Sequence, residues 1–351
     1  MNNPHRLIRA FLKQPVDKTP VWLMRQAGRY LPEYRQIRQQ VPDFLTLCKT
    51  PELACQVSLQ PLERFDLDGA IIFSDILTIP DAMGLGLHFV ENEGPKFKSP
   101  IRSSRDITNL PIPDPEIELS YVCDTIRLVK KSLNNTLPVI GFSGSPWTLA
   151  AYMIEGQSSD NFILAKKMLY DNPASLHELL LKLSNAITIY LNAQIQAGVD
   201  AVMIFDTWGG LLTTSDYCDF SLSYIKQIIS NINHTVPVIV FTKHGGLWLE
   251  HIATSGCDVI GLDWTISIKS AKSRVEKINT RIALQGNLDP AILLTNPDAI
   301  EKSVKTILDE FGKSPGHVFN LGHGVLQQTP VENVKTLVDC VHQMSVPYHV
   351  R

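Results

Sequence analysis

The chain has 351 residues, of which 44% are hydrophobic and 19% charged, and its formal net charge at pH 7 is -3. This length and composition indicate a globular protein with a large core, and the slightly acidic balance excludes a generally basic surface that would coat nucleic acid. No apolar run is long enough for a membrane span, and the scattered cysteines form no CxxC pair, which argues against a disulfide scaffold or a structural zinc site. The first residues lack a signal-peptide pattern, so we expect a cytoplasmic protein that interacts with neither membrane nor nucleic acid.

The first distinctive stretch is a short apolar run, residues 21–24, that leads directly into Arg25 and Arg29. The run is short enough for a buried strand, and Ala27 and Gly28 between the arginines indicate a turn. Each guanidinium group can form two parallel charge-assisted hydrogen bonds to one oxyanion. The stretch therefore predicts a binding loop for a ligand with several carboxylates or phosphates, with a pair of solvated surface arginines as the alternative.

Seven further apolar runs follow, and segments with helical periodicity alternate with them. The predicted strands are residues 21–24, 69–75, 138–143, 201–206, 237–242, 258–263, 281–287 and 317–322. The predicted helices are residues 51–65 (capped by Thr50), 173–197, 222–232, 247–254, 268–278, 298–311 and 331–344. Continuous apolar strands imply burial on both faces, and alternation with helices implies parallel pairing. We therefore predict one α/β domain over residues 1–351, a (β/α)8 TIM-type barrel; an open doubly wound sheet is the alternative.

Two connections in this barrel are long, residues 76–137 after the second strand and residues 144–200 after the third. The first contains stretches rich in proline, glycine and charge at residues 91–96 and 110–115. We expect these stretches to be loops over the barrel mouth rather than linkers between domains.

Polar residues collect where the predicted strands end. In a barrel, the carboxyl ends of all strands face one mouth, so residues that are distant in sequence become neighbours there. The strand ends carry Arg25, Arg29, Asp75, Ser143, Ser145, Asp206, Thr207, Lys243, His244, Asp263, Gln285, Asn287, Asp289 and His323. Each has a simpler alternative reading: the aspartates could cap the helices that follow, and His323, Thr207 and Tyr152 could be ordinary turn or core residues.

Recognised cofactor and metal motifs are missing from the sequence. It contains no HxH, HExxH or HxC ligand pattern, no dinucleotide or phosphate-loop glycine motif, and no GxSxG elbow. The sequence therefore predicts anion-binding arginines, one early carboxylate and one late histidine, with neither a metal nor a cofactor.

Eight motifs in this order carry a family resemblance. They are residues 24–34 (MRQAGRYLPEY), 73–77 (FSDIL), 144–149 (GSPWTL), 152–156 (YMIEG), 205–210 (FDTWGG), 261–264 (GLDW), 285–290 (QGNLDP) and 320–324 (NLGHG). Together they resemble the uroporphyrinogen decarboxylase family. The resemblance implies a cytoplasmic, homodimeric carboxy-lyase of haem biosynthesis with a (β/α)8 fold. Such an enzyme removes carbon dioxide from the four acetate side chains of uroporphyrinogen III, gives coproporphyrinogen III and needs no cofactor.

The resemblance also implies which residues form the site. The implied substrate-binding residues are Arg25, Gln26, Ala27, Gly28, Arg29, Asp75, Tyr152, Thr207 and His323. Asp75, Arg25 and Arg29 are the implied catalytic residues, with Asp75 stabilising a protonated pyrrole. Ser143 and Ser145 stand where many relatives carry alanine, which we expect to add polarity near the third strand.

Two other functions are weighed against this one. Related barrels include corrinoid- or thiol-dependent methyltransferases, which hold zinc on histidine and cysteine; the missing HxC motif argues against that function. The chain could also bind anionic tetrapyrroles without catalysis, in which case the arginines would matter and Asp75 would not. The decarboxylase and the binder both require Arg25 and Arg29 near one ligand, and the decarboxylase also requires Asp75 and His323 beside them.

Overall fold

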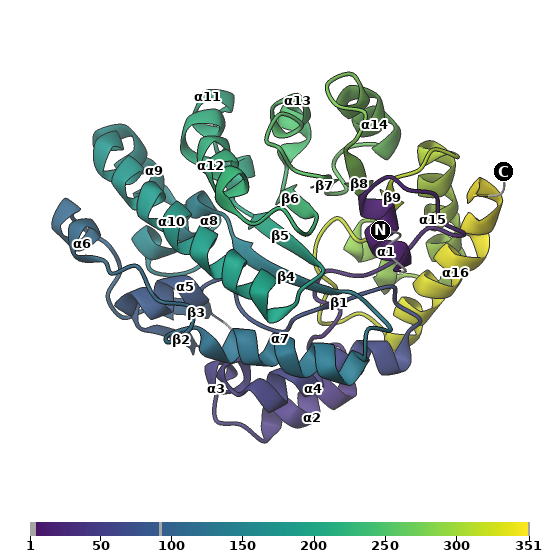
Figure 1. The fold of residues 1–351 in the computed structure, drawn as a ribbon, viewed down its shortest axis with the longest axis horizontal. Coiled ribbons are helices and arrows are strands. Elements are labelled where there is room, and N and C mark those ends of the chain that lie inside the picture. Colours follow the sequence, from purple (N-terminus) through teal and green to yellow (C-terminus); the bar gives the residue numbers. More distant parts are fainter. Residues whose placement is uncertain (1–4, 91–92, 350–351) are drawn as a thin grey trace.

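A seven-stranded parallel sheet forms the centre of the computed structural model, which describes residues 5–90 and 93–349 (Figure 1). Its strands, in spatial order, are β1 (Ala70–Ile71), β4 (Val139–Gly144), β5 (Ala201–Asp206), β6 (Val238–Thr242), β7 (Val259–Gly261), β8 (Ala283–Gln285) and β9 (His317–Val318). The spatial order follows the chain order without the reversal that a doubly wound sheet requires, so the predicted barrel is confirmed and the open-sheet alternative is wrong.

The first predicted strand is wrong as a regular strand, although its place in the barrel is right. Only Val21 forms a β-bridge, parallel to Phe319 just after β9. On its other side, the carbonyl of Val21 accepts a 2.8 Å hydrogen bond from the backbone N–H of Asp68, just before β1. This segment therefore joins the two edge strands of the sheet, as the eighth strand of a barrel does. It forms no ladder because three of its N–H groups donate to side chains instead, and those acceptors are Asp68, Gln26 and Asn320.

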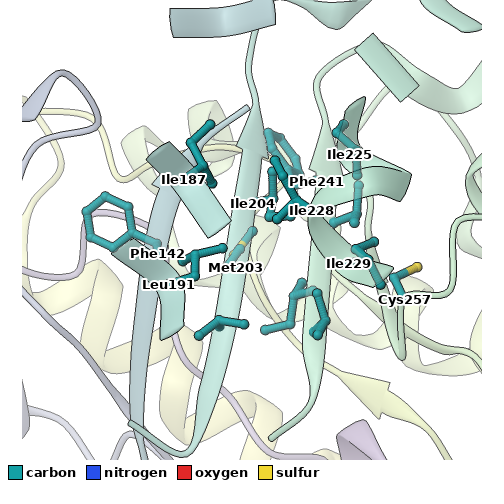
Figure 2. Close-up of a cluster of buried hydrophobic side chains, with 14 of the residues drawn as sticks. Phe142, Ile187, Leu191, Met203, Ile204, Ile225, Ile228, Ile229, Phe241 and Cys257 are labelled. Carbon is teal, nitrogen blue, oxygen red and sulfur yellow. The ribbon is translucent and has the colours of Figure 1, made fainter. Parts of the chain in front are cut away.

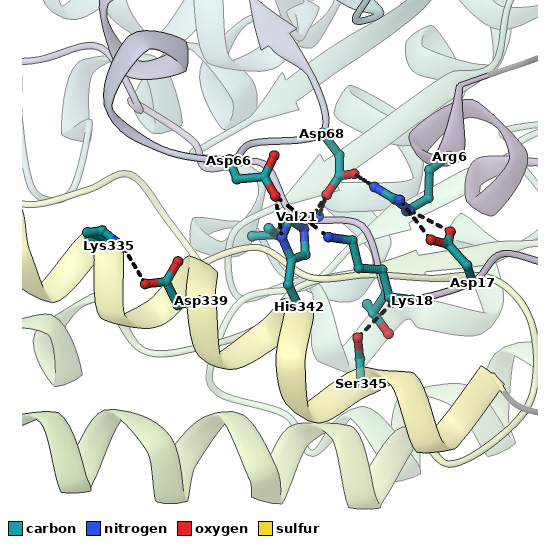
Figure 3. Close-up of polar contacts among 11 residues, drawn as sticks. Arg6, Asp17, Lys18, Val21, Asp66, Asp68, Lys335, Asp339, His342 and Ser345 are labelled. Atoms are coloured by element: carbon teal, nitrogen blue, oxygen red, sulfur yellow. Dashed lines mark hydrogen bonds and ion pairs between the residues drawn. The ribbon is translucent and has the colours of Figure 1, made fainter.

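Asp68 connects both ends of the chain to this joining segment (Figure 3). Its buried carboxylate accepts 2.8 Å hydrogen bonds from the N–H of Val21 and from Nε2 of His342, and it pairs with the Arg6 guanidinium. Arg6 begins helix α1 (Arg6–Phe11), and His342 lies in the last helix, α16 (Val331–His349). Loss of the Asp68 carboxylate would therefore leave several buried or half-buried donors without an acceptor.

Helices cover the outside of the sheet (Figure 1). Besides α1 and α16 they are α2 (Pro32–Gln39), α3 (Phe44–Lys49), α4 (Pro51–Arg64), α5 (Thr78–Pro80), α6 (Ser104–Asn109), α7 (Ser120–Leu133), α8 (Pro146–Glu155), α9 (Ile163–Asp171), α10 (Pro173–Ala197), α11 (Thr214–Tyr217), α12 (Ser223–Asn231), α13 (Leu249–Ile252), α14 (Ile268–Glu276) and α15 (Pro297–Phe311). The predicted helices are present, with ends shifted by a few residues and α13 shortened to one turn. Thr50 is the N-cap residue of α4, as predicted, but its hydroxyl does not bond to the first turn and instead donates to the carbonyl of Thr46 at 2.7 Å.

The two long connections are mostly structured rather than open loops. The first contains α5 to α7 and a hairpin of β2 (Leu87–Val90) and β3 (Gly94–Phe97), and the second contains α8 to α10. The first residue of the stretch at residues 110–115 contacts helix α10, because Lys182 of α10 donates to the carbonyl of Leu110 at 3.3 Å. Residues 91 and 92 of the other predicted mouth loop lie outside the described residues.

The core between sheet and helices fixes the middle strands (Figure 2). Ile225, Ile228 and Ile229 of α12 recur at helical spacing and are buried against β5 and β6. Ile187 and Leu191 of α10 are buried beside β4 and β5 in the same way. This packing positions the carboxyl ends of β4, β5 and β6, where the polar residues begin. Within the described residues, no helix combines the length and apolar character needed to cross a bilayer.

Candidate active site

Arg25 lies directly against the loop that follows β9. A Cβ placed on Gly324 would come within 2.3 Å of Arg25 Cδ, so only glycine allows this contact. The neighbouring backbones are joined as well, because the N–H of Val325 donates to the carbonyl of Met24 at 2.9 Å. Arg25 itself is exposed and has φ 58°, in the left-handed region that costs a non-glycine residue about 1 kcal/mol. The first and last motifs of the sequence thus form one face of the mouth.

Arg29 lies beside the same loop, farther out. Its Nη1 donates to Oε1 of Gln327 at 3.2 Å, and both side chains are exposed. Its guanidinium therefore keeps most of its donors free for a ligand.

Gln26 between the two arginines is buried, and its side chain has a different role from theirs. Its Oε1 accepts from the N–H of Leu23, and its Nε2 donates to the carbonyl of Gly69, both at 3.2 Å. The amide thus ties the arginine loop to the start of β1, and the side-chain groups are already occupied. Ala27 and Gly28 are half-buried and complete the turn.

Asp75 stands four residues after β1 and remains partly accessible although protein surrounds it. Its Oδ1 accepts a 2.8 Å hydrogen bond from the N–H of Leu77, so it also caps the turn that follows. Among the described residues, nothing donates to its Oδ2. Burial raises the pKa of Asp75, while the Leu77 N–H and the charge of Arg25 lower that pKa. The carboxylate therefore has one oxygen fixed and the other able to accept a ligand's hydrogen bond.

Tyr152 of α8 and Trp208 after β5 pack together on another side of the mouth. Their ring centroids are 6.2 Å apart and meet edge to face. Burial raises the pKa of the Tyr152 hydroxyl; Asp75 also raises this pKa and Arg25 lowers it, which places both charges near the hydroxyl. Thr207, beside Trp208, is half-buried.

His323 is half-buried, with its ring 6.2 Å from that of Phe241 at the end of β6. Burial, followed by the positive charges of Arg25 and Lys243, lowers the pKa of His323 to about 3. Its imidazole is therefore neutral at pH 7, with one nitrogen that donates and one that accepts a hydrogen bond.

These residues share one electrostatic neighbourhood. The charge of Arg25 acts on the pKa values of Asp75, Tyr152 and His323 alike, although these residues come from four different parts of the chain. Arg25 also contacts Gly324, next to His323, so geometry and charge together indicate that Arg25, Asp75 and His323 lie at one barrel mouth.

Other strand-end residues prove to be structural, which sequence reasoning did not distinguish. Asp206 is fully buried and accepts from the hydroxyls of Ser145 at 2.6 Å and Ser221 at 2.9 Å, and from two threonines. Burial raises the pKa of Asp206, and these hydroxyls lower it. Ser145 also caps α8 through the N–H of Thr148, so the polarity expected there serves the fold. Asp263 similarly accepts from the N–H of Thr265.

The polar side chains after β8 and at its end also form hydrogen bonds within the fold. Gln285 accepts from Trp22 Nε1 at 2.9 Å, and Asn287 donates to the carbonyls of Asp263 and Ile266. Within the part of the chain that the structure describes, no three His, Cys, Asp or Glu side chains are arranged to hold a metal ion.

Comparisons with known proteins agree with the family resemblance. Residues 2–344 match the family described as uroporphyrinogen decarboxylase (URO-D). The uroporphyrinogen decarboxylase of Pseudoalteromonas atlantica is 59% identical over 349 residues, and that of Actinobacillus succinogenes is 57% identical over 349 residues; each match covers 98% of both chains. Among solved structures, a methyltransferase from Methanosarcina mazei has a TM-score of 0.79 with 23% identity over 96% of this chain and 97% of its own. At that identity, the last similarity concerns the fold alone.

Proposed function

Since this chain belongs to the uroporphyrinogen decarboxylase family, we propose that the mouth described above binds uroporphyrinogen III and that Arg25, Arg29, Asp75, Tyr152, Thr207 and His323 carry its conversion to coproporphyrinogen III. The chain is a carboxy-lyase of tetrapyrrole biosynthesis. The observations that support the proposed residues are the contact of Arg25 with Gly324, next to His323, and the effect of the Arg25 charge on the pKa of Asp75.

The reaction needs a place for the electrons that carbon dioxide leaves behind. Protonation of the pyrrole carbon next to an acetate makes the ring electron-poor, so the ring accepts the electron pair when the carbon–carbon bond breaks. A second proton then converts the exposed methylene into a methyl group, and the ring loses the first proton. No cofactor is needed, because the substrate is its own electron sink.

Asp75 is the group that stabilises this charged ring. In its ionised form the free Oδ2 accepts hydrogen bonds from pyrrole N–H groups, and the negative charge faces the positive ring in a site with little water. A fixed charge of this kind is worth several kcal/mol of barrier, or roughly a hundredfold in rate. Leu77 N–H fixes the other oxygen, so the carboxylate does not have to reorient during the reaction.

The remaining groups bind side-chain carboxylates. Arg25 and Arg29 pair with acetate and propionate groups, and the first proton comes from one of these guanidinium groups or from a water that they hold. Neutral His323, Tyr152 and Thr207 donate further hydrogen bonds. A neutral imidazole suits this task, because the adjacent Arg25 opposes a second positive charge.

The deciding experiment is incubation of the purified protein with uroporphyrinogen III, followed by chromatography of the porphyrinogens by carboxylate number. We expect sequential loss of four carboxylates with carbon dioxide released in proportion. Binding without loss of carboxylates would make the chain a tetrapyrrole binder. The same assay after dialysis against a chelator should give an unchanged rate, whereas a rate restored only by zinc would contradict the metal-free mechanism.

Two further proposals follow from family membership alone: the protein is a homodimer, and it works in the cytoplasm. Sedimentation velocity tests the first, since a single species with the mass of one chain would contradict it. Cell fractionation tests the second.

A further inference from the structure

Lys243 stands at the mouth beside the proposed binding residues. It follows β6 directly, and because Thr242 pairs in register with Asp206, it is level with Thr207 on the neighbouring strand. Its side chain is half-buried, and its ammonium lies 5.7 Å from the centroid of the Trp208 ring. Lys243 thus shares an aromatic surface with Tyr152, whose ring also contacts Trp208.

The backbone on both sides of this contact is held firmly. A Cβ on Gly210 would come within 2.3 Å of the carbonyl oxygen of Lys243, so the loops after β5 and β6 interlock. The backbone carbonyl of Trp208 accepts from Trp147 Nε1 at 3.0 Å, and its N–H donates to the Thr148 hydroxyl at 3.2 Å. The platform under the Lys243 stem is therefore fixed before any ligand binds.

The ammonium has no carboxylate partner in the described part of the chain. The nearby aspartates are occupied: Asp206 by four hydroxyls, and Asp263 by the backbone N–H groups of His244 and Thr265. Lys130 shows the contrast, because this lysine, also half-buried, is paired with Asp200 at 2.8 Å. The charge of Lys243, like that of Arg25, acts on the pKa of His323. A half-buried ammonium near this histidine, without a carboxylate partner among the described residues, is the arrangement expected where an anionic ligand supplies the counter-charge.

We propose that Lys243 binds a side-chain carboxylate of the substrate and holds it over Trp208. Lys243 would then be a third cationic contact of the substrate, in addition to Arg25 and Arg29. The proposal rests on the proposed function, because uroporphyrinogen carries an acetate and a propionate on each pyrrole and so more carboxylates than two arginines can pair. Lys243 then contributes mainly to substrate affinity and not to the chemical step.

Two substitutions at this position separate charge from packing. Lys243→Met removes the charge and keeps a flexible apolar stem on Trp208, whereas Lys243→Arg keeps the charge. Lys269→Met is the matched control, since Lys269 is exposed on α14. The measurements are KM and kcat for uroporphyrinogen III at low and high salt, and the melting temperature.

We expect Lys243→Met to raise KM about tenfold, the scale of one charge-assisted hydrogen bond, with kcat changed less than about threefold. The KM of Lys243→Arg should stay within about threefold of the wild-type KM. The KM of the control Lys269→Met should equal that of wild type. Salt should reduce the difference between wild type and Lys243→Met, because it screens the wild-type attraction.

A wild-type KM in Lys243→Met would overturn the proposal while leaving the proposed function intact, since the wild type still releases carbon dioxide. An equal rise in KM for Lys243→Arg, or a large loss of melting temperature, would also overturn it by assigning Lys243 a packing role. Failure of the wild type itself to decarboxylate would instead refute the proposed function.

Discussion

Asp75→Asn tests the proposed mechanism most directly, because it removes the charge and the free acceptor while it keeps the shape of the side chain. Asparagine has nearly the same shape, and its side-chain oxygen can keep the 2.8 Å hydrogen bond from the Leu77 N–H. The substitution removes the negative charge opposite the protonated pyrrole, and it puts an NH2 donor where Oδ2 would accept the pyrrole N–H hydrogen bonds. Loss of one preorganised electrostatic contact of this kind costs about 3–4 kcal/mol, so kcat should fall roughly 10²- to 10³-fold.

The Asp75→Asn variant should lose activity but not stability. Burial raises the pKa of Asp75 above its ordinary value of 3.8, so the folded state holds this proton more tightly than the unfolded state does. The contribution of Asp75 to stability is therefore most favourable below pH 3.8 and is lost as pH rises through the raised pKa. At pH 7 the ionised carboxylate costs stability that a neutral asparagine does not, so Asp75→Asn should melt at or above the wild-type temperature.

The assay is single-turnover release of carbon dioxide together with thermal denaturation at pH 7. Asp206→Asn is a useful comparison, since that aspartate also follows a strand and is buried, but hydroxyls of the fold occupy it. We expect Asp206→Asn to lower the melting temperature while kcat stays within a few-fold of wild type. A correctly folded Asp75→Asn protein with near-wild-type turnover would refute the role given to Asp75.

Three further predictions concern binding, barrel closure and pH. Arg29→Ala should raise KM about tenfold with an unchanged melting temperature, because the side chain is exposed and bonds only to Gln327 among the described residues; an unchanged KM would make Arg29 an ordinary surface residue. Asp68→Ala should lower the free energy of unfolding by about 3–5 kcal/mol in urea titrations, since it leaves buried partners unpaired, and a loss below about 1 kcal/mol would contradict that role. The folded-state pKa of His323 is lowered to about 3 from 6.5, so the unfolded chain binds this proton first and stability should fall as pH drops from 6.5 towards 3. His323→Gln should weaken that pH dependence, measured as urea midpoints at pH 7 and pH 5, whereas an identical slope would show that His323 is not buried as a neutral ring.

The sequence predicted best the elements whose local pattern matches their final environment. Strands β4, β5 and β6 are apolar runs buried on both faces, and α10 ends at Gly198 with the bounds expected from its pattern. The segment at residues 21–24 has the same apolar character but forms one bridge, because the N–H groups of Val21 and Met24 bond to side chains far away in the sequence. Asn320, which accepts from the N–H of Met24 at 3.0 Å, is 296 positions away. Local periodicity carries no information about such partners.

The proposed site also has features that the sequence pattern predicts and features that it does not. Barrel topology alone predicted that the arginines, Asp75 and His323 lie at one mouth, because all of them follow predicted strands. It could not separate Asp75 from Asp206 or Asp263, since all three follow apolar strands and precede helical turns. Nor did the pattern single out Lys243, which was visible at a strand end but belongs to no motif that carries the resemblance.

Counting hydrogen bonds separates these three aspartates. Asp206 is fully buried and accepts hydrogen bonds from four hydroxyls, and Asp263 accepts from two backbone N–H groups, so both carboxylates find hydrogen-bond partners within the folded chain. Asp75 is also surrounded by protein, yet one N–H contacts one of its oxygens and the described residues offer nothing to the other. A buried carboxylate that is left short of hydrogen-bond partners destabilises the fold. A substrate whose N–H groups and developing positive charge supply those missing partners would recover this cost only when it is bound, and the recovery would be greatest when the ring is protonated. The unmet hydrogen-bonding capacity of Asp75 is therefore what a carboxylate selected to stabilise the transition state requires, and a carboxylate selected to stabilise the fold would not retain it.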